Sequence, residues 1–175
     1  MLTFPTSGKR PSFDYVLLSH DHHFDNLDRS GRAALENAKK VLTTPEGAQR
    51  LGRNSVGLAP WQSVDLPTAA GPTLRVTGTP ARHGPAGLDR GPVIGFVVSA
   101  TDAPQQAFYF AGDTVWYEEV AEVARRFPVA AVILNLGAAR VPEVGPFHLT
   151  MTAAEAVEAA KEFSGAAVIP LHFEG

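Results

Sequence analysis

A dense group of imidazole and carboxylate side chains follows a short apolar run near the start of the chain. The apolar run covers residues 15–18, and the group that follows reads Ser19, His20, Asp21, His22, His23, Phe24, Asp25, Asn26, Leu27, Asp28. Three histidines in one tight turn cannot all be core residues, and they would repel one another if protonated together. Imidazole nitrogens and carboxylate oxygens are the usual protein ligands of a divalent ion such as zinc. The group therefore predicts a metal site at the end of a strand, with a solvated polar loop as the alternative.

Composition narrows the class of protein. The 175 residues suffice for one domain with its own core, and a hydrophobic content of 45% is ordinary for a globular protein. A net charge of -3 argues against a general nucleic-acid binder. Cysteine is absent, which leaves His, Asp and Glu as the strong metal ligands. No membrane span and no signal-peptide layout is found in the sequence, so we expect a cytoplasmic protein.

The hydrophobic pattern predicts a single α/β domain over residues 1–175. We expect strands at residues 14–18, 41–44, 73–79, 93–99, 107–110, 129–136 and 166–169, with weaker signals at 56–58 and 62–66. We expect helices at residues 30–40, 45–51 and 116–127, and a further helix that begins at a capping box, Thr152 with Glu155, and ends at Phe163. Residues 1–12 are expected to be an irregular lead-in.

Four polar residues each follow a different predicted strand: His20, His83, Asp113 and His172. The carboxyl ends of strands in layered α/β folds can open onto one edge, where such folds place their sites. We therefore expect these residues to share a pocket for one or two metal ions. Taken singly, His83 could be an exposed loop histidine, and Asp113 could form an Asx-turn or a helix N-cap. His148 follows no clear strand and is expected to lie at the surface or behind the ligands.

The ordered set of residues resembles the metallo-β-lactamase superfamily of metal-dependent hydrolases, closest to its branch of lactonase-like and phospholipase-D-like proteins. That superfamily carries a His-x-His-x-Asp-His turn after a strand, then a His, an Asp and a His after later strands. The resemblance covers about residues 14–173 and implies an αββα sandwich. It also implies two metal positions. The first would use His20, His22 or His23, and His83; the second would use Asp25 and His172, with Asp113 bridging both.

This chain departs from the family pattern in two places of the first motif. The turn is one residue longer than usual, so either His22 or His23 can be the second ligand. Asn26 stands where the family has its last His, and an amide is a poorer zinc ligand than an imidazole. This change favours a single ion, or an oxygen-rich site suited to manganese or iron.

The chain is also short at both ends relative to the family, as if truncated. This shortness predicts missing outer strands. An exposed sheet edge of that kind favours homo-oligomers.

The resemblance implies an enzyme whose divalent metal, zinc before manganese or iron, lowers the pKa of a bound water to about 7. The resulting metal-bound hydroxide would attack an ester, lactone or phosphodiester of a small-molecule substrate. Asp25 and Asp113 are the expected catalytic carboxylates, with Asp25 orienting the water or accepting its proton. The alternative is a non-catalytic metal-binding or scaffold protein with the same fold. Nucleic-acid processing is disfavoured by the acidic balance.

Overall fold

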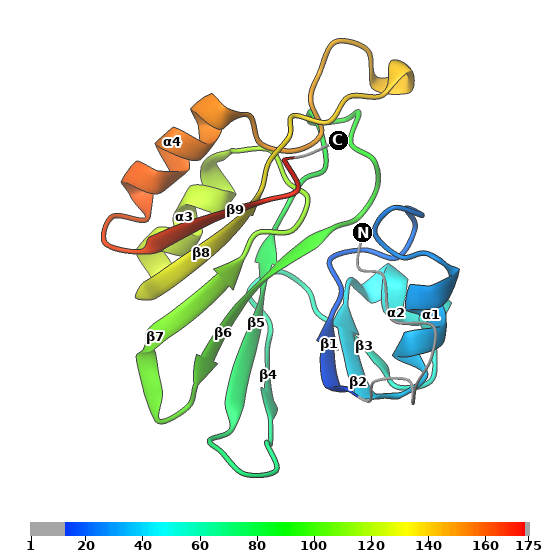
Figure 1. The fold of residues 1–175 in the computed structure, drawn as a ribbon, viewed down its shortest axis with the longest axis vertical. Helices are drawn as coiled ribbons and strands as arrows, with labels where there is room; N and C mark the ends of the chain where they lie inside the picture. Colours follow the sequence, from blue (N-terminus) through cyan, green and yellow to red (C-terminus); the bar gives the residue numbers. More distant parts are fainter. Residues whose placement is uncertain (1–12, 174–175) are drawn as a thin grey trace. The chain divides into compact units, whose positions relative to one another are not determined.

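Two compact units make up the chain, Met1–Leu58 (unit 1) and Ala59–Gly175 (unit 2), and each contains its own β-sheet (Figure 1). The computed structural model describes residues 13–173, so the expected lead-in at residues 1–12 lies outside the described residues. The predicted α/β class is confirmed. A single domain over the whole chain stays a prediction. Among the described residues, no helix has the length and apolar character needed to cross a membrane.

Unit 1 is a parallel three-stranded sheet with two short helices. Its elements are β1 (Phe13–Leu17), α1 (Arg29–Leu35), β2 (Ala38–Thr43), α2 (Pro45–Leu51) and β3 (Ser55–Gly57), with the strands in the order β1-β2-β3. Parallel neighbours need crossover connections, and α1 and α2 provide them. Leu35 of α1 and Leu51 of α2 pack on a small buried cluster formed by Leu18, Leu27, Ala38 and Val41. The helix predicted at residues 45–51 is confirmed, and the Thr44 hydroxyl caps it by accepting from the Gly47 amide.

The helix predicted at residues 30–40 is wrong in its second half. The helix ends at Leu35, and residues from Ala38 onward belong to β2. Ala38 pairs with Phe13 of β1 and its side chain is buried, whereas Lys39 forms an ion pair with Asp14 on β1. Strand pairing and burial outweigh the weak helix propensity of this segment, which a single sequence does not reveal.

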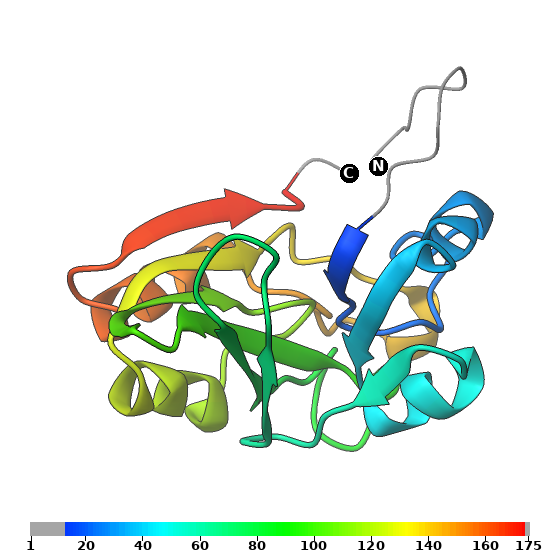
Figure 2. The same ribbon diagram turned by 90° about the horizontal axis from the view of Figure 1, so that it is seen from below.

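Unit 2 is a six-stranded mixed sheet in the order β4-β5-β6-β7-β8-β9. Its strands are β4 (Ser63–Leu66), β5 (Leu74–Pro80), β6 (Ile94–Ala100), β7 (Ala103–Phe110), β8 (Val129–Asn135) and β9 (Ala167–Leu171). β5 and β7 are both antiparallel to β6, and β7, β8 and β9 are mutually parallel. Consequently β5, β7, β8 and β9 all point in one direction. Figure 2 shows β9, in red, at the edge of this sheet next to β8.

The core of unit 2 lies between the sheet and two helices, α3 (Glu118–Arg126) and α4 (Ala153–Glu162). Tyr109 of β7 is fully buried there, with its ring 5.4 Å from that of Phe163. The predicted capping box of α4 is confirmed, since the Thr152 hydroxyl accepts from the Glu155 amide and the Glu155 carboxylate accepts from the Thr152 amide. A short 3₁₀ helix, Pro142–Val144, lies in the connection between β8 and α4.

Gly95 of β6 offers a test of this packing. A methyl group at Gly95 would lie 2.5 Å from the Thr79 hydroxyl oxygen and 2.9 Å from the carbonyl oxygens of Phe110 and Ala111. We predict that Gly95→Ala lowers the free energy of unfolding by about 1–3 kcal/mol, measured by urea denaturation. Ser99→Ala on the same strand serves as the control and should change it by less than about 0.5 kcal/mol. Equal stability of the two variants would contradict the packing described.

Candidate metal centre

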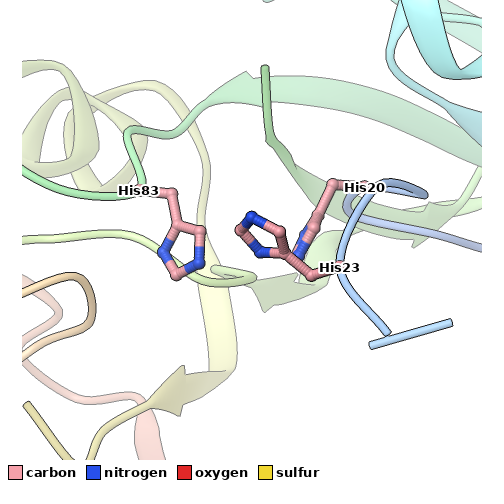
Figure 3. Close-up of side chains that lie close together, drawn as sticks. All are labelled: His20, His23 and His83. Carbon is pink, nitrogen blue, oxygen red and sulfur yellow. The ribbon is translucent and has the colours of Figure 1, made fainter. Parts of the chain in front are cut away.

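The turn after β1 brings three histidines of unit 1 together. The ring centroids lie 5.1 Å apart for His20 and His22, 4.9 Å for His20 and His23, and 4.3 Å for His22 and His23. His20 is buried, His23 is half-buried and His22 is exposed. Figure 3 shows the side chains of His20 and His23 from unit 1 and of His83 from unit 2. The three imidazoles of this turn therefore lie side by side, and their role as metal ligands stays a prediction.

Polar neighbours hold this turn in shape. The Ser19 hydroxyl lies 3.0 Å from Nδ1 of His20, so an ion would bind this ring through Nε2. Asn26, which stands where the resemblance implies a His, donates from its side-chain amide to the carbonyl oxygen of His20 at 2.6 Å. Asn26 thus closes the turn around His20.

Two carboxylates of the same segment have structural roles. The carboxylate of Asp21 accepts hydrogen bonds from Nε of Arg50 at 2.8 Å and from Nη2 of Arg50 at 2.5 Å. These bonds hold the pKa of Asp21 below its ordinary value. Asp28 caps α1 by accepting from the Gly31 amide at 2.6 Å, which lowers the pKa of Asp28 in the same way. Asp25, whose side chain is exposed, is the carboxylate of this turn that is left for a metal or a water.

In unit 2, the loops after β5, β7 and β9 bring His83, Asp113 and His172 together. Nε2 of His83 lies 3.9 Å from Oδ2 of Asp113, and Nδ1 of His172 lies 4.0 Å from Oδ1 of Asp113. These separations exceed a hydrogen bond. They suit two ligands of one ion, since atoms each about 2.0–2.2 Å from zinc can be up to about 4 Å apart. The set of two imidazoles and one carboxylate therefore fits a divalent metal.

The N-cap interpretation of Asp113 is wrong. The N-cap residue of α3 is Tyr117, and the carboxylate of Asp113 instead accepts a hydrogen bond from the side-chain amide of Asn135 at 2.6 Å. Both His83 and Asp113 are buried, so each needs such a partner to offset its lost hydration.

Two residues that position these ligands were not found by sequence reasoning. Asn135 is the last residue of β8, and its polar side chain at the end of a nearly continuous apolar strand was the available signal. The carbonyl oxygen of Leu149 lies 3.0 Å from Nδ1 of His83. A backbone carbonyl leaves no trace in the residue types, so this contact had no sequence signal.

The loops that carry His83 and Asp113 are joined next to the ligands. The Thr114 hydroxyl accepts from the backbone amide of Arg82, and the Val115 amide donates to the Arg82 carbonyl. The Arg82 guanidinium lies 4.3 Å from the ring centre of Tyr117, a favourable cation–π contact. Burial raises the pKa of Tyr117 to about 12, so its phenol is protonated at neutral pH. These contacts fix the spacing between the two ligand loops of unit 2.

The segment after β8 supports His172 through its backbone. The Leu136 amide donates to the carbonyl of Leu171 at 2.8 Å. Gly137 adopts a left-handed φ of +97°, and a methyl group there would lie 2.6 Å from the carbonyl oxygen of His172. His172 itself has a φ of 57°, an uncommon value for a residue other than glycine. Close approach of Gly137 is therefore part of what places His172.

Comparison with known proteins gives the family. Residues 2–173 match the model of the beta-lactamase superfamily domain. The chain therefore belongs to this superfamily. The chain is 32% identical to a "UPF0173 metal-dependent hydrolase" of Opitutus terrae over 170 residues, which cover 91% of this chain and 66% of the relative. A protein of the same description from Caldivirga maquilingensis is 25% identical over 173 residues, covering 96% of this chain and 67% of the relative.

Solved structures agree on the fold. An isothiocyanate hydrolase from Delia radicum gut bacteria superposes with a TM-score of 0.71 at 24% identity, over 91% of this chain and 62% of that chain. A metallo-β-lactamase fold protein, YhfI from Bacillus subtilis, gives a TM-score of 0.63 at 16% identity, over 91% of this chain and 64% of that chain. The predicted metallo-β-lactamase-like fold is confirmed. This chain spans about two thirds of the length of the curated relatives it matches.

The buried ion pair beside the histidine turn gives a testable consequence. The side chain of Asp21 is 2% exposed and that of Arg50 is 47% exposed. We predict that Arg50→Met lowers the free energy of unfolding by about 2–4 kcal/mol at pH 7, because it leaves a buried carboxylate without its partner. Since the pKa of Asp21 is lower in the folded state, this stabilisation is present above about pH 4 and is lost as the pH falls through the folded-state pKa.

Arg53→Met is the matched control for that substitution. Arg53 lies 3.9 Å from Glu36 in an exposed ion pair, so its loss should cost less than about 1 kcal/mol. Chemical denaturation at pH 7 and pH 3 compares both variants with the wild type. An equal and pH-independent cost for the two variants would contradict the role given to Arg50.

Proposed function

We propose that this chain is a metal-dependent hydrolase that acts on a small-molecule ester, lactone or phosphodiester. The observation that carries the proposal is the carboxylate of Asp113, whose two oxygens face two different histidines, His83 and His172, at 3.9 and 4.0 Å. A carboxylate so placed is suited to ligating one ion or bridging two. Membership of the beta-lactamase superfamily and the description of curated relatives as metal-dependent hydrolases support the same activity.

The proposed ligands all follow strands. His20, His23 and Asp25 lie in the turn after β1, and His83, Asp113 and His172 follow β5, β7 and β9. We select His23 over His22 because His23 is half-buried, whereas His22 is exposed. Nitrogen and carboxylate donors in this ratio suit zinc first, with manganese or iron as alternatives, and one or two ions.

The metal, Asp25 and Asn135 would each have a separate role in hydrolysis. The metal, when bound, would supply Lewis acidity and a lowered pKa for water. Asp25, an exposed carboxylate of the same turn, would orient the attacking water through its carboxylate oxygens and accept its proton. Asn135 keeps the Asp113 carboxylate fixed by donating to Oδ1.

The substrate and partners are proposed at the level of class. One structural neighbour is described as an isothiocyanate hydrolase, so an electrophilic carbon centre is within the chemistry of this fold. Fold alone does not choose among carbonyl and phosphoryl substrates. The net charge of -3 supports a small molecule rather than a nucleic acid. Homo-oligomer formation and a cytoplasmic location stay predictions.

Hydrolysis assays test the proposal. Protein loaded with zinc or manganese would be given p-nitrophenyl butyrate, an N-acyl homoserine lactone and bis(p-nitrophenyl) phosphate. We expect turnover of at least one, and a loss of about 10²–10⁴-fold in kcat for Asp25→Asn because the water loses its proton acceptor. Asp14→Asn, which removes an exposed carboxylate paired with Lys39 in the same unit, should keep wild-type activity. Metal-loaded wild type that hydrolyses none of the three would favour the non-catalytic alternative.

A further inference from the structure

We propose that His148 and Glu155 form a positioning pair that holds His83 in its ligand orientation through the carbonyl of Leu149. The inference rests on the proposed metal role of His83 and extends it to a part of unit 2 outside the ligand set. All the contacts that carry it lie within unit 2.

Glu155 does more than cap its helix. One oxygen of its carboxylate accepts from the backbone amide of Thr152 at 2.8 Å and from the Thr152 hydroxyl at 3.0 Å. Nε2 of His148 lies 3.0 Å from each oxygen of the same carboxylate. A capping box needs only the contacts with Thr152. The contact with His148 additionally ties the chain four residues before the N-cap to the first turn of α4.

The backbone of Leu149, the residue after His148, has a partner at both its amide and its carbonyl group. Its amide donates to the carbonyl of Ala139 at 2.8 Å, and its own carbonyl lies 3.0 Å from Nδ1 of His83. Its side chain is buried and lies against Gly84, where an added methyl group would come within 3.0 Å of it. Because Leu149 directly follows His148, the position of its carbonyl depends on where the pair holds residue 148.

The carbonyl of Leu149 determines how His83 presents its ring. A carbonyl oxygen only accepts hydrogen bonds, so it selects the tautomer of His83 that carries its proton on Nδ1. The lone pair then lies on Nε2, the atom that is 3.9 Å from Oδ2 of Asp113. Partners of this kind typically change metal affinity about 10–100-fold when they are lost. The pair therefore acts on the metal site without touching an ion.

The side-chain requirement at position 148 follows from this geometry. The side chains of His148 and Glu155 are 30% and 24% exposed, so their contact is partly shielded from water. A donor group at residue 148 is needed to reach the carboxylate. Glutamine can supply that N–H donor, whereas phenylalanine keeps a ring of similar shape but has no donor.

Three variants test the inference. His148→Phe removes the donor, His148→Gln restores one, and Glu158→Gln is the control, since Glu158 pairs with Lys161 on the exposed side of α4. Zinc affinity would be measured by competition with a chromophoric chelator. Nitrogen-15 NMR on the metal-free protein would report the tautomer of His83, and circular dichroism would check the fold. We expect His148→Phe to weaken zinc binding by about 10-fold or more and to lose the single Nδ1–H tautomer.

We expect His148→Gln and the control to behave as the wild type in both readouts. Wild-type zinc affinity together with an unchanged His83 tautomer in folded His148→Phe would overturn the inference. Failure of folded His148→Gln to restore either readout would also overturn it, because the donor would then not be what matters. If the wild type bound no zinc, the proposed function would fail, whereas the tautomer of His83 in the metal-free variants would still decide the role of the pair.

Discussion

The common direction of β5, β7, β8 and β9 is the constraint on which the proposed centre of unit 2 depends. β6 lies between β5 and β7 and is antiparallel to both. It carries the chain back to the opposite end of the sheet, from which β7 can start in the same direction as β5. The result is that His83, Asp113 and His172 leave the sheet at the same end, together with Asn135. A reversal of one of these strands would carry its polar residue to the opposite end.

Burying such polar groups removes their hydration, and hydrogen-bond partners within the protein replace it. Asp113 is held by an amide donor, His83 by a backbone carbonyl and Asp21 by a guanidinium. Leaving a buried polar group without a partner costs about 1–3 kcal/mol, and more for a charge. The partners of Asp113 and His83 also fix direction, because Oδ2 of Asp113 and Nε2 of His83 then face each other. The contacts that offset burial therefore also orient these two proposed ligands.

Much of the fold could be predicted from the sequence, because its signals are local. Strand periodicity located β5 to β9 within a few residues, and the capping box at Thr152 marked the start of α4. The early end of α1 could not be predicted, since it results from pairing between β1 and β2. The candidate ligands were identifiable because each follows a strand. Their supports were not identified, because Asn135 is distant in sequence from Asp113 and Leu149 acts through its backbone.

The central claim is that the chain holds a divalent metal through the histidines and carboxylates that follow its strands, and the metal content of purified protein tests it most directly. Elemental analysis would compare the wild type with His20→Ala from unit 1, His83→Ala from unit 2, and His22→Ala as the control. We predict about one to two equivalents of a divalent metal in the wild type and the control, and loss of metal in both other variants, because each of them lacks one proposed ligand. Full metal content in either His20→Ala or His83→Ala would contradict the role of that histidine as a ligand.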